Sequence, residues 1–156
     1  MKTFDHLSVI GLREWIDLPE LGVAGLRAKI DTGASTSTLH ATEVVQFERD
    51  GKPWVRFTAH LGTLVQLRHR HCQAPLVAVK TIKSSNGQTQ TRYVILTTLA
   101  LGDRAWPVEF TLTCRKAMRY RVLLGSKALI DGQLVVNPAL TYVQDKPLFP
   151  KLLGAQ

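Results

Sequence analysis

The chain has 156 residues, of which 45% are hydrophobic and 21% are charged, values typical of a soluble globular protein with one core. No apolar run approaches the length of a membrane-spanning helix, and the first 15 residues lack the continuous apolar segment of a signal peptide. We therefore expect one cytoplasmic domain over residues 1–156 that does not enter a membrane.

The net charge of +8 is unevenly distributed. Residues 1–50 hold 5 basic and 8 acidic residues, whereas residues 51–156 hold 15 basic and 4 acidic residues. Such an excess predicts an acidic partner (nucleic acid, an anionic surface or an acidic peptide), unless the cations serve only solubility. The two cysteines, Cys72 and Cys114, are too few for a disulfide framework and predict reduced thiols, although one bridge between them also fits the count.

The N-terminal half predicts short strands joined by tight turns. Apolar runs and alternation predict strands at residues 7–9, 23–30, 44–47 and 53–61. The dipeptide Asp50-Gly51 is typical of a hairpin turn. Residues 64–79 contain two apolar pieces, and Pro75 argues against a central strand across that point.

The C-terminal half continues in the same way. Asn86-Gly87 predicts a hairpin over residues 80–96, and residues 104–113 alternate as a strand does. Residues 119–130 predict a buried strand, a glycine and one helical turn. Two further strand pieces are expected within residues 133–143, and residues 144–156, with two prolines, predict an extended arm. Together these elements indicate a mainly β fold, a closed barrel or a sandwich.

Residues 28–41, AKIDTGASTSTLHA, carry the clearest chemical signal. An apolar strand leads into Asp31-Thr32-Gly33, and four small hydroxyl residues follow. A carboxylate at a strand end, beside a glycine that lets backbone approach backbone, is typical of an acid at the floor of a cleft. By itself the tripeptide also fits an ordinary turn. The segment Leu123-Leu124-Gly125, later in the chain, fits the same architecture as the acidic turn.

Several segments in order give the chain a recognisable resemblance: residues 11–22, 28–41, 72–75, 84–95, 106–113, 118–125 and 136–142. With them the chain resembles retropepsin-like aspartic peptidases, and most closely the bacterial RimB-like family, also labelled "ATP-dependent zinc protease". The resemblance implies a retropepsin-like closed β-barrel, the half-lobe of an acid protease, with one short helix. The label names a metal and a nucleotide, but the sequence contains neither HExxH nor a P-loop, so we expect no cofactor and no metal.

The resemblance also implies roles for individual residues. Asp31 would be the catalytic aspartate, and Thr32 and Gly33 would hold its loop, with the Thr32 hydroxyl bonding to a partner loop. The structural residues of this site would be Ala34, Ser35, Leu124 and Gly125. The flap, a hairpin that closes over substrate, would have its tip at Ser84, Ser85, Asn86 and Gly87.

Only one such aspartate motif is present, whereas this chemistry needs two carboxylates that share a proton. We therefore expect a homodimer in which Asp31 of a second subunit completes the site. The chain departs from the family pattern at Ser35 and Ser126, where charged residues are common. Because both charged side chains are absent, neither leaves the other buried without a partner, but the rim of the site that faces substrate is altered.

The basic residues near these segments suggest a substrate. Arg92 flanks the flap, and Arg119 and Arg121 precede the Gly125 loop; arginines of this kind suit carboxylate contacts in acidic or glutamylated peptides. They also fit scattered surface charges of little energetic effect. Relatives of the family resemble partners of RimK-type ATP-grasp glutamate ligases, so a ligase system is a possible partner.

Three rival interpretations remain open. The chain could be a weakly active or inactive binding partner or regulator of a RimK-type ligase, which the serines at positions 35 and 126 favour. A nucleic-acid-binding barrel would concentrate aromatic residues among its cations, and this chain does not, so we expect no nucleic acid. A metallopeptidase would need a ligand set, and only His69, His71 and Cys72 cluster; on a strand, Cys72 points away from the two histidines.

Overall fold

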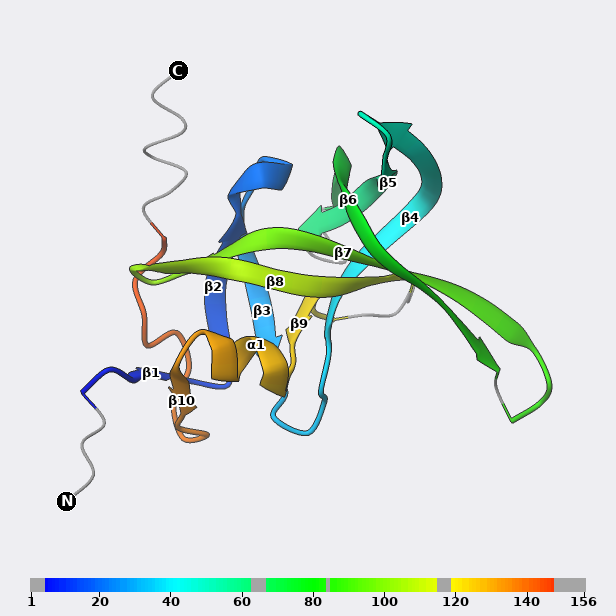
Figure 1. The fold of residues 1–156 in the computed structure, drawn as a ribbon. Coiled ribbons are helices and arrows are strands. Elements are labelled where there is room, and N and C mark those ends of the chain that lie inside the picture. The colour runs from blue at the N-terminus through cyan, green and yellow to red at the C-terminus, as the bar shows by residue number, and fades with distance from the viewer. Residues whose placement is uncertain (1–4, 63–66, 84, 115–118, 148–156) are drawn as a thin grey trace.

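The computed structural model describes residues 5–62, 67–83, 85–114 and 119–147, and over these the chain is mainly β with one short helix (Figure 1). The strands are β1 (Ser8–Ile10), β2 (Arg13–Leu18), β3 (Val23–Ile30), β4 (Ser37–Arg49), β5 (Lys52–Gly62), β6 (Leu67–Lys83), β7 (Thr89–Leu101), β8 (Arg104–Thr113), β9 (Val122–Leu124) and β10 (Leu134–Val136). The helix α1 spans Ser126–Asp131, and a 3-10 turn, η1, spans Pro19–Leu21. The predicted mainly β fold with one short helix is confirmed.

Strand pairing within the described residues closes on itself. β2 pairs with β3, β3 with β9, β9 with β4, β4 with β8, β8 with β7, and β7 returns to β2. The inward face of these strands forms the hydrophobic core, in which Ile16, Leu39 and Phe110 are completely buried. This ring brings the ends of β3 and β9 beside the start of β4, three segments that are far apart in the sequence.

β4, β5 and β6 also pair as an antiparallel sheet. The alternation predicted in β5 is confirmed, because all four residues expected on one face are buried: Val55, Phe57, Ala59 and Leu61. The predicted turn joins β4 to β5, and Asp50 and Gly51 both adopt a positive φ there, 52° and 75°. Such a turn matches the twist of the strands that it connects.

The prediction for Pro75 is wrong, because β6 runs continuously through it between β5 and β7. Pro75 pairs with Trp54 near the start of β5, and the pairing with β7 begins at Leu76. Proline thus lies where the strand leaves one neighbour and joins the other, a point at which a missing N–H interrupts neither ladder.

The second strand predicted within residues 133–143 is also wrong. β10 ends at Val136, and the chain then turns, with the Leu140 N–H donating to the Asn137 carbonyl at 3.1 Å, before the N–H groups of Val143 and Gln144 bind a buried carboxylate. Glu14 is fully buried on β2, and its two oxygens accept hydrogen bonds from the N–H groups of Gly11, Val143 and Gln144, at 2.7, 2.9 and 3.0 Å. A carboxylate with several backbone donors holds this segment to β2.

The tryptophans and cysteines differ in how deeply they are buried. Trp15, Trp54 and Trp106 are half-buried, and the Trp106 indole N–H donates to the Ala128 carbonyl at 3.1 Å. An indole is a large apolar group with one polar donor, so an edge position suits it. Cys72 and Cys114 are both free thiols, the first buried and the second exposed. No helix among the described residues has the length and apolar character needed to cross a membrane.

Candidate active site

Asp31 lies directly after β3, in a turn that the neighbouring strand holds in place. The Asp31 N–H donates to the Leu124 carbonyl at 2.9 Å, and the Ala34 N–H donates to the Asp31 carbonyl at 3.3 Å. The Asp31 carboxylate accepts a hydrogen bond from the Gly33 N–H at 3.0 Å. Asp31 is half-buried, and Thr32 and Gly33 are exposed. A carboxylate is therefore presented at the surface by a fixed backbone turn.

The strand β9 and the residues after it brace this turn. β9 pairs in parallel with β3 and antiparallel with β4, so it holds both sides of the loop that connects them. The Ser126 N–H donates to the Ala34 carbonyl at 2.6 Å, and the Lys127 N–H donates to the Ser35 carbonyl at 3.2 Å. The structure thus brings residues 34–35 beside residues 125–127 through backbone contacts.

Gly125 is required by this packing. A Cβ added at Gly125 would lie 2.4 Å from the Thr36 carbonyl oxygen and 2.8 Å from that of Ala34. Real Cβ atoms do not approach backbone oxygens so closely, and the surrounding backbone is fixed by strand pairing. The glycine is therefore needed for the two loops to touch.

Ser37 supports the same contact, and the sequence alone did not distinguish it from its hydroxyl neighbours. Its side chain is buried, and its Oγ accepts a hydrogen bond from the Gly125 N–H at 3.0 Å. The signal available in the sequence was a run of four hydroxyl residues, and Ser37 is the one whose side chain bonds to Gly125 in the described structure.

We expect Ser37→Ala to lower the free energy of unfolding by about 1–3 kcal/mol, because it leaves the buried Gly125 N–H without a partner. Chemical denaturation of the wild type and the variant measures this difference. Thr36→Ala is the matched control, since Thr36 is exposed and its contact to this region is through its backbone. Equal stability of Ser37→Ala and the wild type would contradict the bracing role.

Gly33 differs from Gly125, and the prediction that it permits a close backbone approach is wrong within this chain. Among the described residues, a Cβ at Gly33 would meet only the Asp31 carboxylate oxygen, at an ordinary contact distance of 3.4 Å. Its φ angle is also outside the left-handed region that favours glycine. Neither packing nor backbone conformation of the single chain accounts for a glycine here.

The hairpin predicted as a flap is formed by β6 and β7. Ser85, Asn86 and Gly87 lie at its tip, where Gly87 has a φ of 85°, and Ser84 lies outside the described residues. The hairpin also exposes apolar side chains: Val77, Val79 and Ile82. Arg92 pairs across the hairpin with Lys80, and its Nε is buried without a hydrogen-bond partner.

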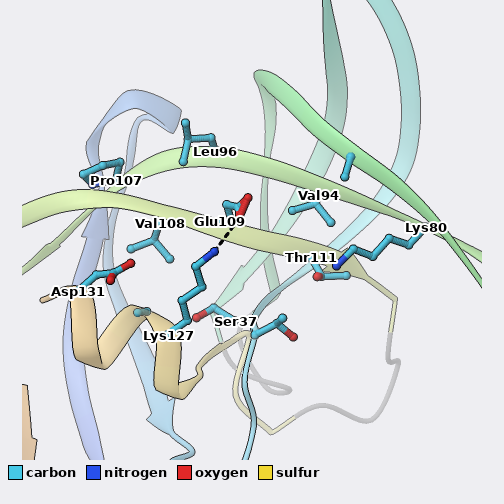
Figure 2. Close-up of a pocket in the computed structure, with 13 residues that line it drawn as sticks. Ser37, Lys80, Val94, Leu96, Pro107, Val108, Glu109, Thr111, Lys127 and Asp131 are labelled. Atoms are coloured by element: carbon cyan, nitrogen blue, oxygen red, sulfur yellow. Dashed lines mark hydrogen bonds and ion pairs between the residues drawn. The ribbon is translucent and has the colours of Figure 1, made fainter.

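A cavity of about 430 Å³ lies beside the Asp31 loop, between the base of this hairpin, β8 and α1 (Figure 2). Thr36 and Ser37 line it on the loop side, and the Lys80 side chain lines it on the hairpin side. Figure 2 shows Lys127 of α1 and Glu109 of β8 pointing toward one another, and their charged atoms are 3.4 Å apart. Asp31 itself is not among the residues that line this cavity.

Arg119 and Arg121 lie away from the loop with which the sequence grouped them. Ala28 pairs with Val122, so Arg121 is level with Arg27 at the far end of the β3–β9 pair. Arg27 precedes Asp31 by four residues, which is roughly 13 Å along a strand. These arginines therefore belong to a different part of the surface.

The histidines of β5 and β6 face one another without forming a ligand cluster. His69 pairs with His60, and the His71 Nδ1 lies 3.1 Å from the Thr58 hydroxyl, while Cys72 is buried on the opposite face. Within the described part of the chain, no three His, Cys, Asp or Glu side chains gather as a metal site would need.

A family model and a solved structure each match most of this chain. The model of the RimB-like family, described as "Retropepsin-like aspartic endopeptidase RimB", matches residues 9–147. A solved structure of a Legionella pneumophila protein of unknown function superposes with a TM-score of 0.74 at 31% identity, over 88% of this chain and 98% of that one.

Curated relatives are longer proteins. A probable alpha-L-glutamate ligase from Desulfotalea psychrophila is 42% identical over 85% of this chain, and one from Shewanella pealeana is 43% identical over 84%. The chain spans only 28% and 29% of the lengths of these relatives.

Proposed function

The chain belongs to the RimB-like family of retropepsin-like aspartic endopeptidases, and from this membership we propose that it hydrolyses peptide or isopeptide bonds with Asp31 as a catalytic acid and base. The closed ring of strands would be the half-lobe barrel of an acid protease, with residues 1–156 as one domain. The β6–β7 hairpin would close over the substrate. We place the reaction in the cytoplasm, where the two free thiols would stay reduced.

The observation that carries this proposal is the braced and open Asp31 turn. Its backbone is held by Leu124 on one side and Ala34 on the other, and its carboxylate accepts the Gly33 N–H. Preorganised groups of this kind need no rearrangement when charge develops in a reaction. Asp31 itself is only half-buried, which leaves part of its side chain accessible.

A second carboxylate is needed, and we propose that it comes from another copy of the chain. All twelve Asp and Glu residues lie in the described ranges, and no hydrogen bond joins Asp31 to any other of them there. Two Asp31 turns that met on a twofold axis would place like charges close enough to share one proton. One carboxylate would then activate water while the other protonated the carbonyl oxygen of the scissile bond.

We propose acidic or glutamylated peptides as substrates. The curated relatives are named probable alpha-L-glutamate ligases, which links this sequence type to glutamate chemistry. The basic excess beyond residue 50 complements such substrates, and Lys80 lines the cavity beside the Asp31 loop. Arg92 and Ser84–Gly87 would contact the substrate from the flap.

A second candidate function is that of a weakly active or inactive partner of a RimK-type ligase. Ser35 and Ser126 favour it, because they stand where charged residues are common in the family. Their backbones still hold the loop, through the bonds from Lys127 to Ser35 and from Ser126 to Ala34. The loop architecture therefore does not depend on those charges.

Cleavage of oligoglutamate and isopeptide-linked glutamate peptides distinguishes these functions. We expect cleavage that a pepstatin-type inhibitor blocks and a chelator leaves unchanged. Loss of cleavage with the chelator alone would favour a metallopeptidase. Absence of cleavage under all conditions, with retained binding to a glutamate ligase, would favour the partner function.

A further inference from the structure

A second pocket is lined by four arginines. It has a volume of about 190 Å³ and lies at the far end of the β3–β9 pair from Asp31. The four arginines are Arg27, Arg68, Arg119 and Arg121. The other lining residues are Trp15, Gly25, Leu26, Gly62 and Tyr120. No acidic side chain is among the lining residues. We refer to this pocket as the arginine pocket.

Tyr120 is the centre of the cluster. The guanidinium carbons of Arg13, Arg27 and Arg119 each lie 5.9 Å from the centroid of its ring. A ring face attracts a cation, but three guanidinium groups around one ring repel one another. The arrangement concentrates positive charge that an anion between the groups would relieve.

Arg121 adds a buried charge to the same pocket. It is only 6% exposed, and its Nε is buried without a hydrogen-bond partner. Arginine cannot lose its proton in a protein, so it must remain charged there. The Arg121 charge affects two nearby histidines. Burial lowers the pKa of His40 and of His60, and the Arg121 charge lowers these two pKa values further.

The chain's own carboxylates do not neutralise these arginines. All twelve lie in the described ranges, and the ion pair that the structure shows there joins Lys127 to Glu109, far from this pocket in the fold. Asp17 contacts one lining residue, because its carboxylate accepts a hydrogen bond from the Gly25 N–H at 2.8 Å. Burial raises the pKa of Asp17, which disfavours the charge that would be needed.

We propose that the arginine pocket binds clustered carboxylates of an acidic peptide, as a site separate from the Asp31 turn. Arginine forks match carboxylates in pairs of hydrogen bonds, and a buried unpaired guanidinium gains most from such a partner. A nucleic acid would need a free ring face on which its bases could stack, whereas Lys146 lies over the Trp15 ring and three guanidinium groups surround the Tyr120 ring. The claim that the bound peptide is also a substrate rests on the proposed function. The claim that the pocket binds an acidic peptide does not.

Binding is measured by fluorescence anisotropy with a labelled oligoglutamate peptide and the full chain carrying Asp31→Asn, so that the peptide is not consumed. The double variant Arg27→Gln/Arg68→Gln removes two cations from the pocket. We expect its affinity to fall roughly tenfold or more, since two charge-assisted contacts are lost. The control Lys52→Gln/Arg56→Gln removes two exposed cations from β5 and should change affinity by less than about twofold. Thermal unfolding verifies that all variants are folded.

Three results would overturn the inference: equal losses in both double variants, equal binding of a neutral oligoglutamine peptide, or tighter pocket-dependent binding of an RNA oligonucleotide. Measuring peptide binding and peptide cleavage on the same variants separates this inference from the proposed function. A pocket variant that binds weakly, in a chain whose wild type cleaves nothing, supports the pocket and counts against the peptidase. Normal cleavage together with unaltered binding in the pocket variant would support the peptidase and count against the pocket.

Discussion

The Asp31→Asn variant is expected to lose peptide cleavage by roughly a thousandfold or more in kcat while it stays folded. A carboxamide cannot take up and return a proton, and acid–base catalysis contributes about 10²–10⁴ to such rates. The variant keeps the shape of the side chain and an oxygen that can accept the Gly33 N–H, so the turn should persist. Initial rates on an oligoglutamate peptide measure the effect, and thermal unfolding monitors the fold.

Asp103→Asn is the control for this prediction. Asp103 is an exposed aspartate in the turn between β7 and β8, and its substitution removes the same charge away from the site. We expect unchanged rates for this variant. Cleavage by Asp31→Asn at the wild-type rate would exclude Asp31 as the catalytic acid and base.

Gly33→Ala is expected to abolish dimer formation and cleavage while the free energy of unfolding of the single chain changes by less than about 1 kcal/mol. The chain has room for a Cβ at this position, and the backbone conformation tolerates alanine. In the proposed dimer a second chain packs against this turn, and a methyl group at position 33 would collide with it. Sedimentation velocity and kcat/KM measure the two losses.

Gly125→Ala gives the opposite pattern and serves as the comparison. Its Cβ would meet the Thr36 carbonyl oxygen at 2.4 Å, so the variant should be destabilised as a single chain. If Gly33→Ala instead formed active dimers, the proposed packing of two turns would be wrong. If both variants were equally destabilised, Gly33 would have an intrachain role that its geometry does not show.

The elements that were predicted correctly have a local signal. Buried and exposed side chains alternate along most of β5, and the dipeptides Asp50-Gly51 and Asn86-Gly87 form hairpin turns. Gly125 separates β9 from α1. Each is determined by residues close together in the sequence, so periodicity and turn chemistry were sufficient. The link between Asp31 and Gly125 came from a family resemblance, because spacing alone could not establish it.

The errors have a tertiary origin. Pro75 is tolerated in β6 because the strand changes neighbours there. The chain after β10 turns instead of forming a strand, and Glu14 of β2 holds its end through the N–H groups of Val143 and Gln144. The arginine pocket draws on β3, β6 and the segment before β9, and strand pairing alone brings these together. Local pattern contains no information about such assemblies.

The central claim, that each chain supplies half of one active site, is tested most directly by mixing subunits. Wild-type chain at fixed concentration is equilibrated with a ninefold excess of Asp31→Asn chain, and cleavage is measured. If both carboxylates are needed, mixed dimers are inactive and the rate falls to about one tenth of that of the wild type alone. A rate that stays unchanged at any excess of the variant would show that one chain holds a complete site and would contradict the account.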